Sequence, residues 1–172
     1  MVAVCVQSVA ADEPSADWGR VDRLVVEKEQ RRLHVEVDGR RVASLPIGLG
    51  FAPTGTKLRE GDGATPEGTY RVCVKNPQSQ YYLSLGLDYP NTADARRGRA
   101  DGRIDSEQAR AIETAIQAGR CPPWDTPLGG TIYIHGRGSA TDWTLGCIAL
   151  DDDAIERLFA AVAVGTPVEI RP

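Results

Sequence analysis

Alternation of apolar and polar side chains predicts short β-strands along most of the chain. Residues 32–38 are typical, because Leu33, Val35 and Val37 fall on one side and polar residues separate them. The segments with this alternation, or with a short apolar run between turn residues, are 23–27, 32–38, 41–47, 70–75, 80–87, 131–134, 148–150 and 167–170. The first two are expected to form a hairpin.

Two segments have the helical period instead. Residues 106–118 follow Asp105, a favourable N-cap residue, and stop at Gly119. The second helix follows the aspartates at 151–153, which we expect to cap it rather than to bind a metal, and it ends at Gly165. Its apolar positions recur at i, i+3, i+4 and i+7, namely Ile155, Leu158, Phe159 and Val162. Short strands, Gly/Pro turns and only two helices favour a mainly β fold, a β-sandwich, over an α/β fold.

Residues 76–126 separate the strand at 70–75 from the strand at 131–134 by a long stretch that contains the first helix. Connections of this length are uncommon in a compact domain and usually have a function. We therefore predict a lid-like insertion that covers a functional site. The alternative is a surface excursion that only packs its helix on the sheet.

The composition is that of one soluble globular domain, expected over residues 18–172. The 172 residues include 41% apolar residues, and the net charge of -4 offers no electrostatic surface for nucleic acid. No stretch approaches the roughly 20 apolar residues of a membrane span. Residues 1–17 are apolar and then acidic, and their Val9-Ala10-Ala11 segment fits a signal-peptidase site, although a basic n-region is missing. We favour the end of a signal peptide over a disordered leader.

Histidine is scarce, and this narrows the candidate chemistry. His34 falls on the polar side of the strand at 32–38, so we interpret it as structural. His135 ends the strand at 131–134, and Cys147 directly precedes the apolar run at 148–150. A thiol and an imidazole at adjacent strand ends form the pair that nucleophilic catalysis needs. The alternative is a core histidine beside a buried cysteine.

The other cysteines leave two interpretations open. Cys5 lies in the N-terminal segment, while Cys73 and Cys121 are either a disulfide or two unpaired thiols, and the sequence alone favours the unpaired state. The chain has no C-x-x-C pair and only two histidines. We therefore predict neither a zinc site nor any other metal or cofactor.

The residues around the Cys/His pair resemble the active-site signature of the L,D-transpeptidase catalytic domain (the YkuD family). The matching residues are His135-Gly136 and then Thr144-x-Gly146-Cys147-Ile148, and upstream Lys57, 61–63 (GDG), 65–70 (TPEGTY) and 125–130 (DTPLGG). The resemblance spans about residues 21–171. The chain departs from many members at Ala149, where they have Arg or Asn, and in its short loop between His135 and Cys147.

The resemblance implies a mainly β domain with the catalytic cysteine at one end of the sheets. Cys147 is then the nucleophile and His135 the general base and acid, with an imidazolium lowering the pKa of the thiol. The Gly136 carbonyl orients His135, and Asp142 is a rival for that role. Backbone N–H groups of Gly146 and Cys147 form the oxyanion hole. The residues expected to bind substrate are Thr144, Tyr133, Arg137 and Trp143.

The resemblance also implies a substrate and a compartment. Peptidoglycan stem peptides are the expected donor and acceptor: Cys147 forms a thioester, D-alanine is released, and a second amine gives a 3→3 cross-link. Transfer to water or to a lipoprotein lysine, or hydrolysis of such a linkage, are alternatives. So are a non-catalytic cell-wall-binding module and an unrelated cysteine protease. We expect a monomeric enzyme of the periplasm or cell envelope.

Overall fold

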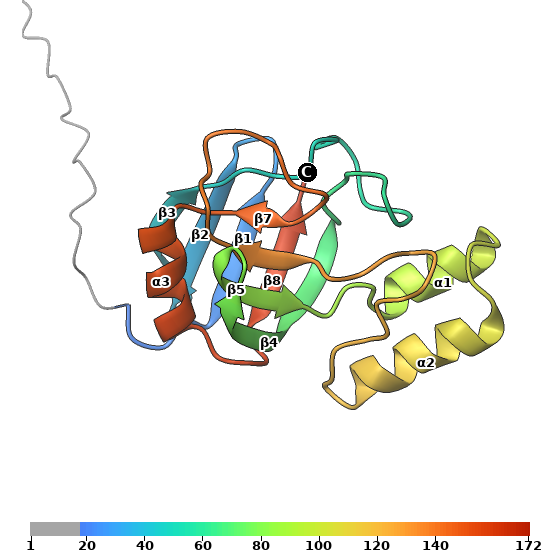
Figure 1. The fold of residues 1–172 in the computed structure, drawn as a ribbon. Coiled ribbons are helices and arrows are strands. Elements are labelled where there is room, and N and C mark those ends of the chain that lie inside the picture. Colours follow the sequence, from blue (N-terminus) through green and yellow to red (C-terminus); the bar gives the residue numbers. More distant parts are fainter. Residues whose placement is uncertain (1–17) are drawn as a thin grey trace, which may run out of the picture.

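The computed structural model describes residues 18–172, so the predictions for residues 1–17, including Cys5, lie outside the described residues. The strands are β1 (Arg23–Glu27), β2 (Arg32–Val37), β3 (Arg40–Pro46), β4 (Gly68–Ser79), β5 (Tyr82–Leu87), β6 (Tyr133–His135), β7 (Ile148–Ala149) and β8 (Pro167–Arg171). The helices are α1 (Thr92–Ala100), α2 (Ser106–Gln117) and α3 (Asp152–Ala161). Figure 1 shows strands β5–β7 in front of the layer formed by β1, β2, β3 and β8. The predicted mainly β fold is confirmed.

Strand β4 connects the two layers. The strand order is β3-β2-β1-β8-β4-β5-β6-β7. The first four residues of β4 pair with β8, and the remainder pairs with β5 after a register irregularity between Val72 and Val74. On the other side, two isolated bridges, Gly48 to Ala149 and Gly50 to Thr144, connect the chain after β3 to the region of β7. The layers therefore meet along both sides.

Apolar side chains from both layers form the core between them. Its fully buried members include Leu24, Val26, Leu33 and Val35 from β1 and β2, and Ile134 and Ile148 from β6 and β7. Helix α3 packs on β5 and adds Ile155 and Leu158 to this core. The strands that end at the functional residues are thus fixed by burial on their inner face.

Helix α1 is a correction, because the sequence predicted only two helices and none at residues 92–100. A capping box begins the helix, with Asn91 and Asp94 each accepting from the other's backbone N–H. Its buried residues are only Asp94, Ala95 and Gly98. Since Gly98 packs closely against Leu128 and no large apolar residue recurs in the helix, the helical period was absent from the sequence.

His34 is a second correction. It lies on the face of β2 opposite to the core, as predicted, but it exposes only 3% of its surface instead of being solvated. The Glu27 carboxylate lies 3.4 Å from His34 Nε2, and Arg41 approaches the same carboxylate at 3.9 Å. Long charged side chains of neighbouring strands therefore lie around the imidazole on this face.

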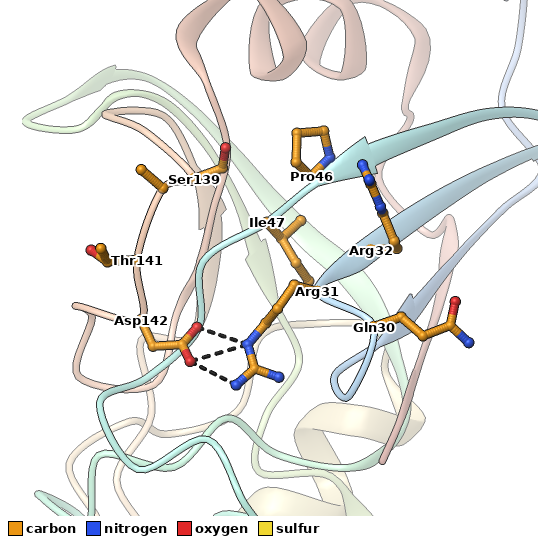
Figure 2. Close-up of a pocket in the computed structure, with 9 residues that line it drawn as sticks. Gln30, Arg31, Arg32, Pro46, Ile47, Ser139, Thr141 and Asp142 are labelled. Carbon is orange, nitrogen blue, oxygen red and sulfur yellow. Dashed lines mark hydrogen bonds and ion pairs between the residues drawn. The ribbon is translucent and has the colours of Figure 1, made fainter. Parts of the chain in front are cut away.

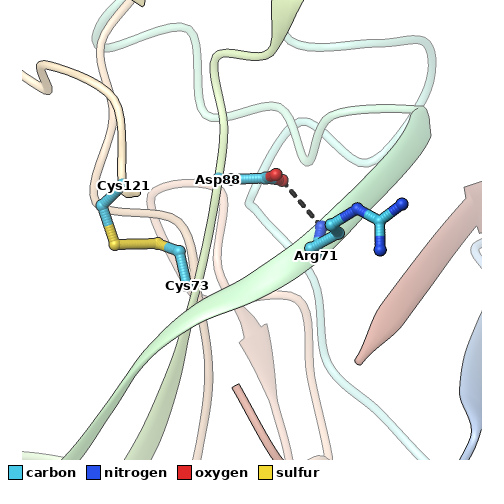
Figure 3. The surroundings of a disulfide bond; sticks show 4 residues. All are labelled: Arg71, Cys73, Asp88 and Cys121. Atoms are coloured by element: carbon cyan, nitrogen blue, oxygen red, sulfur yellow. Dashed lines mark hydrogen bonds between the residues drawn. A yellow bond between two sulfur atoms is a disulfide. The ribbon is translucent and has the colours of Figure 1, made fainter. Parts of the chain in front are cut away.

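Cys73 and Cys121 form a disulfide, which corrects the preference for unpaired thiols (Figure 3). Cys73 lies on β4 and Cys121 follows α2, with 5.2 Å between their Cα atoms. Nearby, where β5 ends, the Asp88 carboxylate accepts a hydrogen bond from the Arg71 N–H at 2.7 Å. The two contacts hold the chain that leaves the sheet against β4.

The part of the chain that leaves the sheet spans residues 88–132, since β4 and β5 occupy the beginning of the predicted insertion. We call residues 88–132 the excursion. Helices α1 and α2 pack on each other around a small apolar cluster of Ala95, Ile104, Ala109, Ile112 and Leu128. Figure 1 shows both helices at one side of the sandwich. None of the helices in the described part of the chain combines the length and apolar character of a bilayer span.

Candidate active site

A cavity of about 780 Å³ lies where β6 and β7 meet the excursion. Cys147 and His135 both line it. Trp124, Gly129 and Gly130 of the excursion line it too, so the excursion forms one wall of the cavity.

His135 is held in one tautomer by the backbone. It ends β6, is buried, and its Nδ1 lies 2.7 Å from the Gly136 carbonyl oxygen. A carbonyl oxygen can only accept, so Nδ1 carries the proton and Nε2 keeps its lone pair. The ring stacks on Tyr81 at 4.5 Å between centroids, and it packs edge to face with Trp143 at 5.6 Å between centroids. These contacts fix the orientation of a neutral imidazole with a basic Nε2.

Cys147 is placed beside the same strand. Strands β6 and β7 are parallel, with Ile134 opposite Ile148, and Cys147 directly precedes β7. The Tyr133 N–H donates to Cys147 Sγ at 3.4 Å. Because Tyr133 and His135 are two residues apart on one strand, their side chains share a face. The strand pairing therefore brings the thiol and the imidazole to one wall of the cavity.

Thr144 braces the turn before Cys147. Its hydroxyl donates to the Cys147 carbonyl at 2.7 Å and accepts the Gly146 N–H at 3.1 Å. Gly146 has φ +131, and a Cβ there would lie 2.7 Å from the Ala64 carbonyl oxygen, so only glycine fits. The Gly146 amide is thus already hydrogen-bonded. The Cys147 N–H is the amide of this pair that has no acceptor among the described residues.

Burial acts on the ionisation of both groups. It raises the pKa of the Cys147 thiol, and the opposing effects of the Tyr133 N–H and of the Lys57 charge are smaller. It also lowers the pKa of His135, against the smaller effect of the Gly136 hydrogen bond. Both directions favour a neutral thiol and a neutral imidazole, whereas the family resemblance implies an imidazolium that lowers the thiol pKa.

Asp142 anchors the loop between His135 and Cys147, and it does not orient the imidazole. We call residues 136–146 the catalytic loop. Asp142 forms a bidentate pair with Arg31 of the β1–β2 turn and accepts the Leu49 N–H at 2.9 Å. The pair lines a separate cavity of about 290 Å³, and Figure 2 shows the contacts between the two side chains. Asp142 thus ties the catalytic loop to the residue before β2 and to the segment that follows β3.

The aspartates at the start of α3 also anchor the catalytic loop. Asp151 is the N-cap residue, but its side chain makes no cap hydrogen bond, contrary to prediction. It accepts from the N–H and the hydroxyl of Ser139 instead, and Asp152 accepts the Arg137 N–H at 2.8 Å. Gly136 is required here, because a Cβ would lie 2.4 Å from the Asp152 carboxylate.

The structure brings most of the predicted site residues together. Tyr133, Thr144 and Trp143 line the cavity with Cys147 and His135. Arg137 does not line it; this residue has φ +80, its side chain is exposed, and its amide is bound to Asp152.

The residues of the site that were not predicted to belong to it include Tyr81, Lys57 and Trp124. Lys57 was noted only as part of a sequence motif, and Tyr81 reaches His135 through the pairing of β5 with β6. A tyrosine next to the end of a strand gives no local sequence signal that it will stack on a histidine of another strand.

A mainly β sandwich with a Cys/His pair on adjoining strand ends defines the class of this domain. The sequence profile of the L,D-transpeptidase catalytic domain (YkuD) matches residues 21–170, so the chain belongs to the L,D-transpeptidase catalytic domain family. No curated protein sequence matches the chain significantly.

Solved structures share the fold. The helical cell shape determining protein Pgp2 from Campylobacter jejuni is 26% identical, with a TM-score of 0.60 over 89% of this chain and 48% of that one. Bdellovibrio bacteriovorus Bd1075 is 24% identical, with a TM-score of 0.57 over 89% of this chain and 48% of that one. An L,D-transpeptidase from Xylanimonas cellulosilytica is 15% identical, with a TM-score of 0.52 over 93% of this chain and 65% of that one. The chain spans about half the length of Pgp2 and Bd1075.

Proposed function

We propose that this protein is a cysteine-dependent L,D-transpeptidase that acts on peptidoglycan stem peptides. The observation that carries the proposal is the placement of Cys147 and His135 in one cavity, with His135 Nδ1 bound to the Gly136 carbonyl. An imidazole with a free Nε2 in the same cavity as a cysteine, in a chain of this family, supports acyl transfer through sulfur.

The first half-reaction forms a thioester. His135 Nε2 takes the proton of the Cys147 thiol as sulfur attacks the carbonyl carbon of the third stem residue. The Cys147 N–H donates to the oxyanion of the tetrahedral intermediate. The C–N bond to the terminal D-alanine then breaks, and the leaving nitrogen takes the proton from His135. Because the thiol and imidazole begin neutral, proton transfer accompanies attack.

The second half-reaction releases the thioester. His135 takes a proton from an acceptor amine as that amine attacks, and Cys147 leaves as a thiolate that regains its proton. An amine of a second stem peptide gives a 3→3 cross-link, while water in the same place gives hydrolysis. The excursion, which forms one wall of the cavity, is proposed to act as a lid-like cover that controls which acceptor enters.

The cell envelope is the proposed place of action, since this is where the substrate of the family lies. The likeness to Pgp2, described as a helical cell shape determining protein, supports a contribution to cell-wall organisation and cell shape.

Mass spectrometry of purified tetrapeptide muropeptides incubated with the protein tests the proposal. Loss of D-alanine together with a cross-linked dimer, both abolished in Cys147→Ala, is the expected result. Tripeptide without dimer would assign hydrolysis instead. An intact substrate without any thioester on Cys147 would contradict both reactions and favour a wall-binding module.

A further inference from the structure

One lysine lines the cavity around Cys147. Of the Lys, Arg, Asp and Glu side chains in the described part of the chain, only Lys57 and Glu60 line this cavity. Glu60 is exposed, whereas the Lys57 side chain exposes only 3% of its surface. A buried ammonium group needs acceptors for its three N–H donors, so its partners decide what it does.

Asp62 and the chain around it hold the ammonium group from one side. Lys57 Nζ donates to Asp62 Oδ1 at 2.8 Å and to the Arg59 carbonyl at 3.0 Å. The Asp62 carboxylate also accepts the N–H groups of Leu58, Arg59 and Ala64. Burial raises the pKa of Asp62, but these hydrogen bonds outweigh it and hold the pKa below its ordinary value. One Lys57 N–H is left without an acceptor among residues 18–172.

The two other lysines of the chain differ from Lys57. Lys28 is equally buried, but it donates to the Glu67 carboxylate and to two backbone carbonyls, so all its donors are used. Lys75 donates to two backbone carbonyls and lies over the Phe159 ring at 4.5 Å. Neither lines the cavity. Lys57 thus combines a spare donor with access to the site.

Part of the wall of the cavity that Lys57 lines carries no side chains. Gly61 of the Lys57 loop and Gly129 and Gly130 of the excursion line the same cavity and present no side chains to it. A Cβ on Gly130 would lie 2.4 Å from Trp124, so the wall cannot carry a larger residue there. The charge of Lys57 is also felt at Cys147, where it opposes the effect of burial on the thiol pKa. A negative group bound by Lys57 would therefore lie near the reacting carbonyl.

We propose that Lys57 is a specificity-determining residue that binds a carboxylate of the peptide whose carbonyl Cys147 attacks. The identity of that peptide rests on the proposed function, but the carboxylate site does not. In a stem peptide the carboxylate has two sources: the C-terminus of the leaving residue, or the side chain of the diamino acid that donates the acyl group. Both offer the oxygen acceptors that a lysine with a spare N–H requires.

Alkylation of Cys147 tests the site without any natural substrate. Iodoacetate and iodoacetamide both form an S–C bond and release iodide, and they differ only in carrying a carboxylate or an amide. The rate ratio of iodoacetate to iodoacetamide at Cys147, followed by peptide mass spectrometry, is expected to be at least five-fold higher in the wild type than in Lys57→Met. Lys57→Arg, which keeps the charge, and Lys28→Met, which removes a buried lysine elsewhere, are expected to keep most of the wild-type ratio.

Equal ratios in wild type and Lys57→Met would overturn the proposal and leave Lys57 as a structural partner of Asp62. If Lys57→Met does not fold, the wild type alone decides. Acetyl-D-alanine should then slow alkylation by iodoacetamide, while its amide should not. Protection by both compounds or by neither would overturn the proposal.

Stem tetrapeptides with one carboxylate amidated identify the source. We expect one of the two analogues to lose at least ten-fold in kcat/KM with the wild type, mainly through KM, and Lys57→Met to process that analogue and the parent alike. If the wild type processes both analogues like the parent, the carboxylate site is wrong although the proposed function stands. If the wild type processes no peptide but its rate ratio of iodoacetate to iodoacetamide still exceeds that of Lys57→Met, the proposed function fails and the site stands.

Discussion

The two walls of the cavity are built in different ways. Strands β6 and β7 carry His135 and Cys147, and their pairing and the buried core behind them fix both residues. The excursion, which forms another wall, has only a small apolar cluster of its own and is joined to β4 by the Cys73–Cys121 disulfide. The reacting groups therefore depend on the sheet, while the shape of the cavity depends on a covalent tether. We therefore expect mutations of His135 or Cys147 to lower activity with little change in stability, and mutations that loosen the excursion to lower stability more than activity.

The largest expected effect is a loss of activity, without loss of stability, when His135 is replaced. His135→Gln removes the base, so kcat/KM for tetrapeptide processing should fall about 10²- to 10⁴-fold, as is usual for a general base. The thermal midpoint should change by only a few degrees, because the core strands remain. Steady-state kinetics and a melting curve measure both. His34→Gln is the matched control, since it alters a buried histidine outside the cavity. An equal loss of activity in both variants would contradict the assignment of His135.

The tether should show the reverse behaviour. The disulfide closes a loop of 48 residues in sequence separation, which corresponds to about 4 kcal/mol of unfolding free energy by the chain-entropy relation. We expect Cys73→Ser combined with Cys121→Ser to lose about 2–4 kcal/mol in denaturant unfolding, and to become sensitive to proteolysis within residues 88–132. Activity should fall less than in His135→Gln. An unchanged unfolding free energy would show that the excursion docks without the tether.

The strands that carry His135 and Cys147 could be predicted from the sequence, because the alternation of apolar and polar residues is a local pattern. Alternation placed the strands, and the position of His135 and Cys147 at strand ends predicted their meeting. The excursion side was less accessible. Helix α1 buries only small and polar residues, so it has no apolar period, and the pairing of Cys73 with Cys121 depends on how the excursion folds back.

Contacts between distant parts of the chain were the other gap. Arg31 and Asp142 are 111 residues apart, and neither has a neighbour in the sequence that indicates the other. Lys57 belonged to a motif, but only its three-dimensional partners distinguish it from Lys28. Asp151 looked like a helix cap, yet its carboxylate binds Ser139, because the catalytic loop passes over the start of α3.

The anchoring of the catalytic loop should have an intermediate effect, on both activity and stability. Asp142→Ala removes the acceptor of Arg31 and of the Leu49 N–H, so we expect a loss of about 1–2 kcal/mol, given that the ion pair is partly exposed. Activity should fall about ten-fold, since the loop carries the Gly136 carbonyl that orients His135. Asp142→Asn keeps an acceptor for Leu49 and should lose less. Wild-type activity in Asp142→Ala would contradict a role for this anchor in the site.

The smallest expected effect is on the pH dependence of alkylation at Cys147, and it tests the charge state of the two residues that β6 and β7 position. Burial raises the pKa of the thiol and lowers that of His135, so neither group is charged near neutral pH. A raised thiol pKa means that the thiolate appears only at higher pH than in a free cysteine. The rate of iodoacetamide alkylation at Cys147 should therefore reach half its maximum above the pH found for a model thiol.

The same reasoning sets the acid side of catalysis. Because the pKa of His135 is lowered, tetrapeptide processing should remain active below the ordinary histidine range and fall only when the imidazole becomes protonated. A preformed thiolate–imidazolium pair predicts the opposite for the thiol, with fast alkylation that is independent of pH from mildly acidic conditions upward. Parallel alkylation profiles of the wild type and His135→Gln distinguish the two states, because only an ion pair would lose its acidic reactivity when the imidazole is removed.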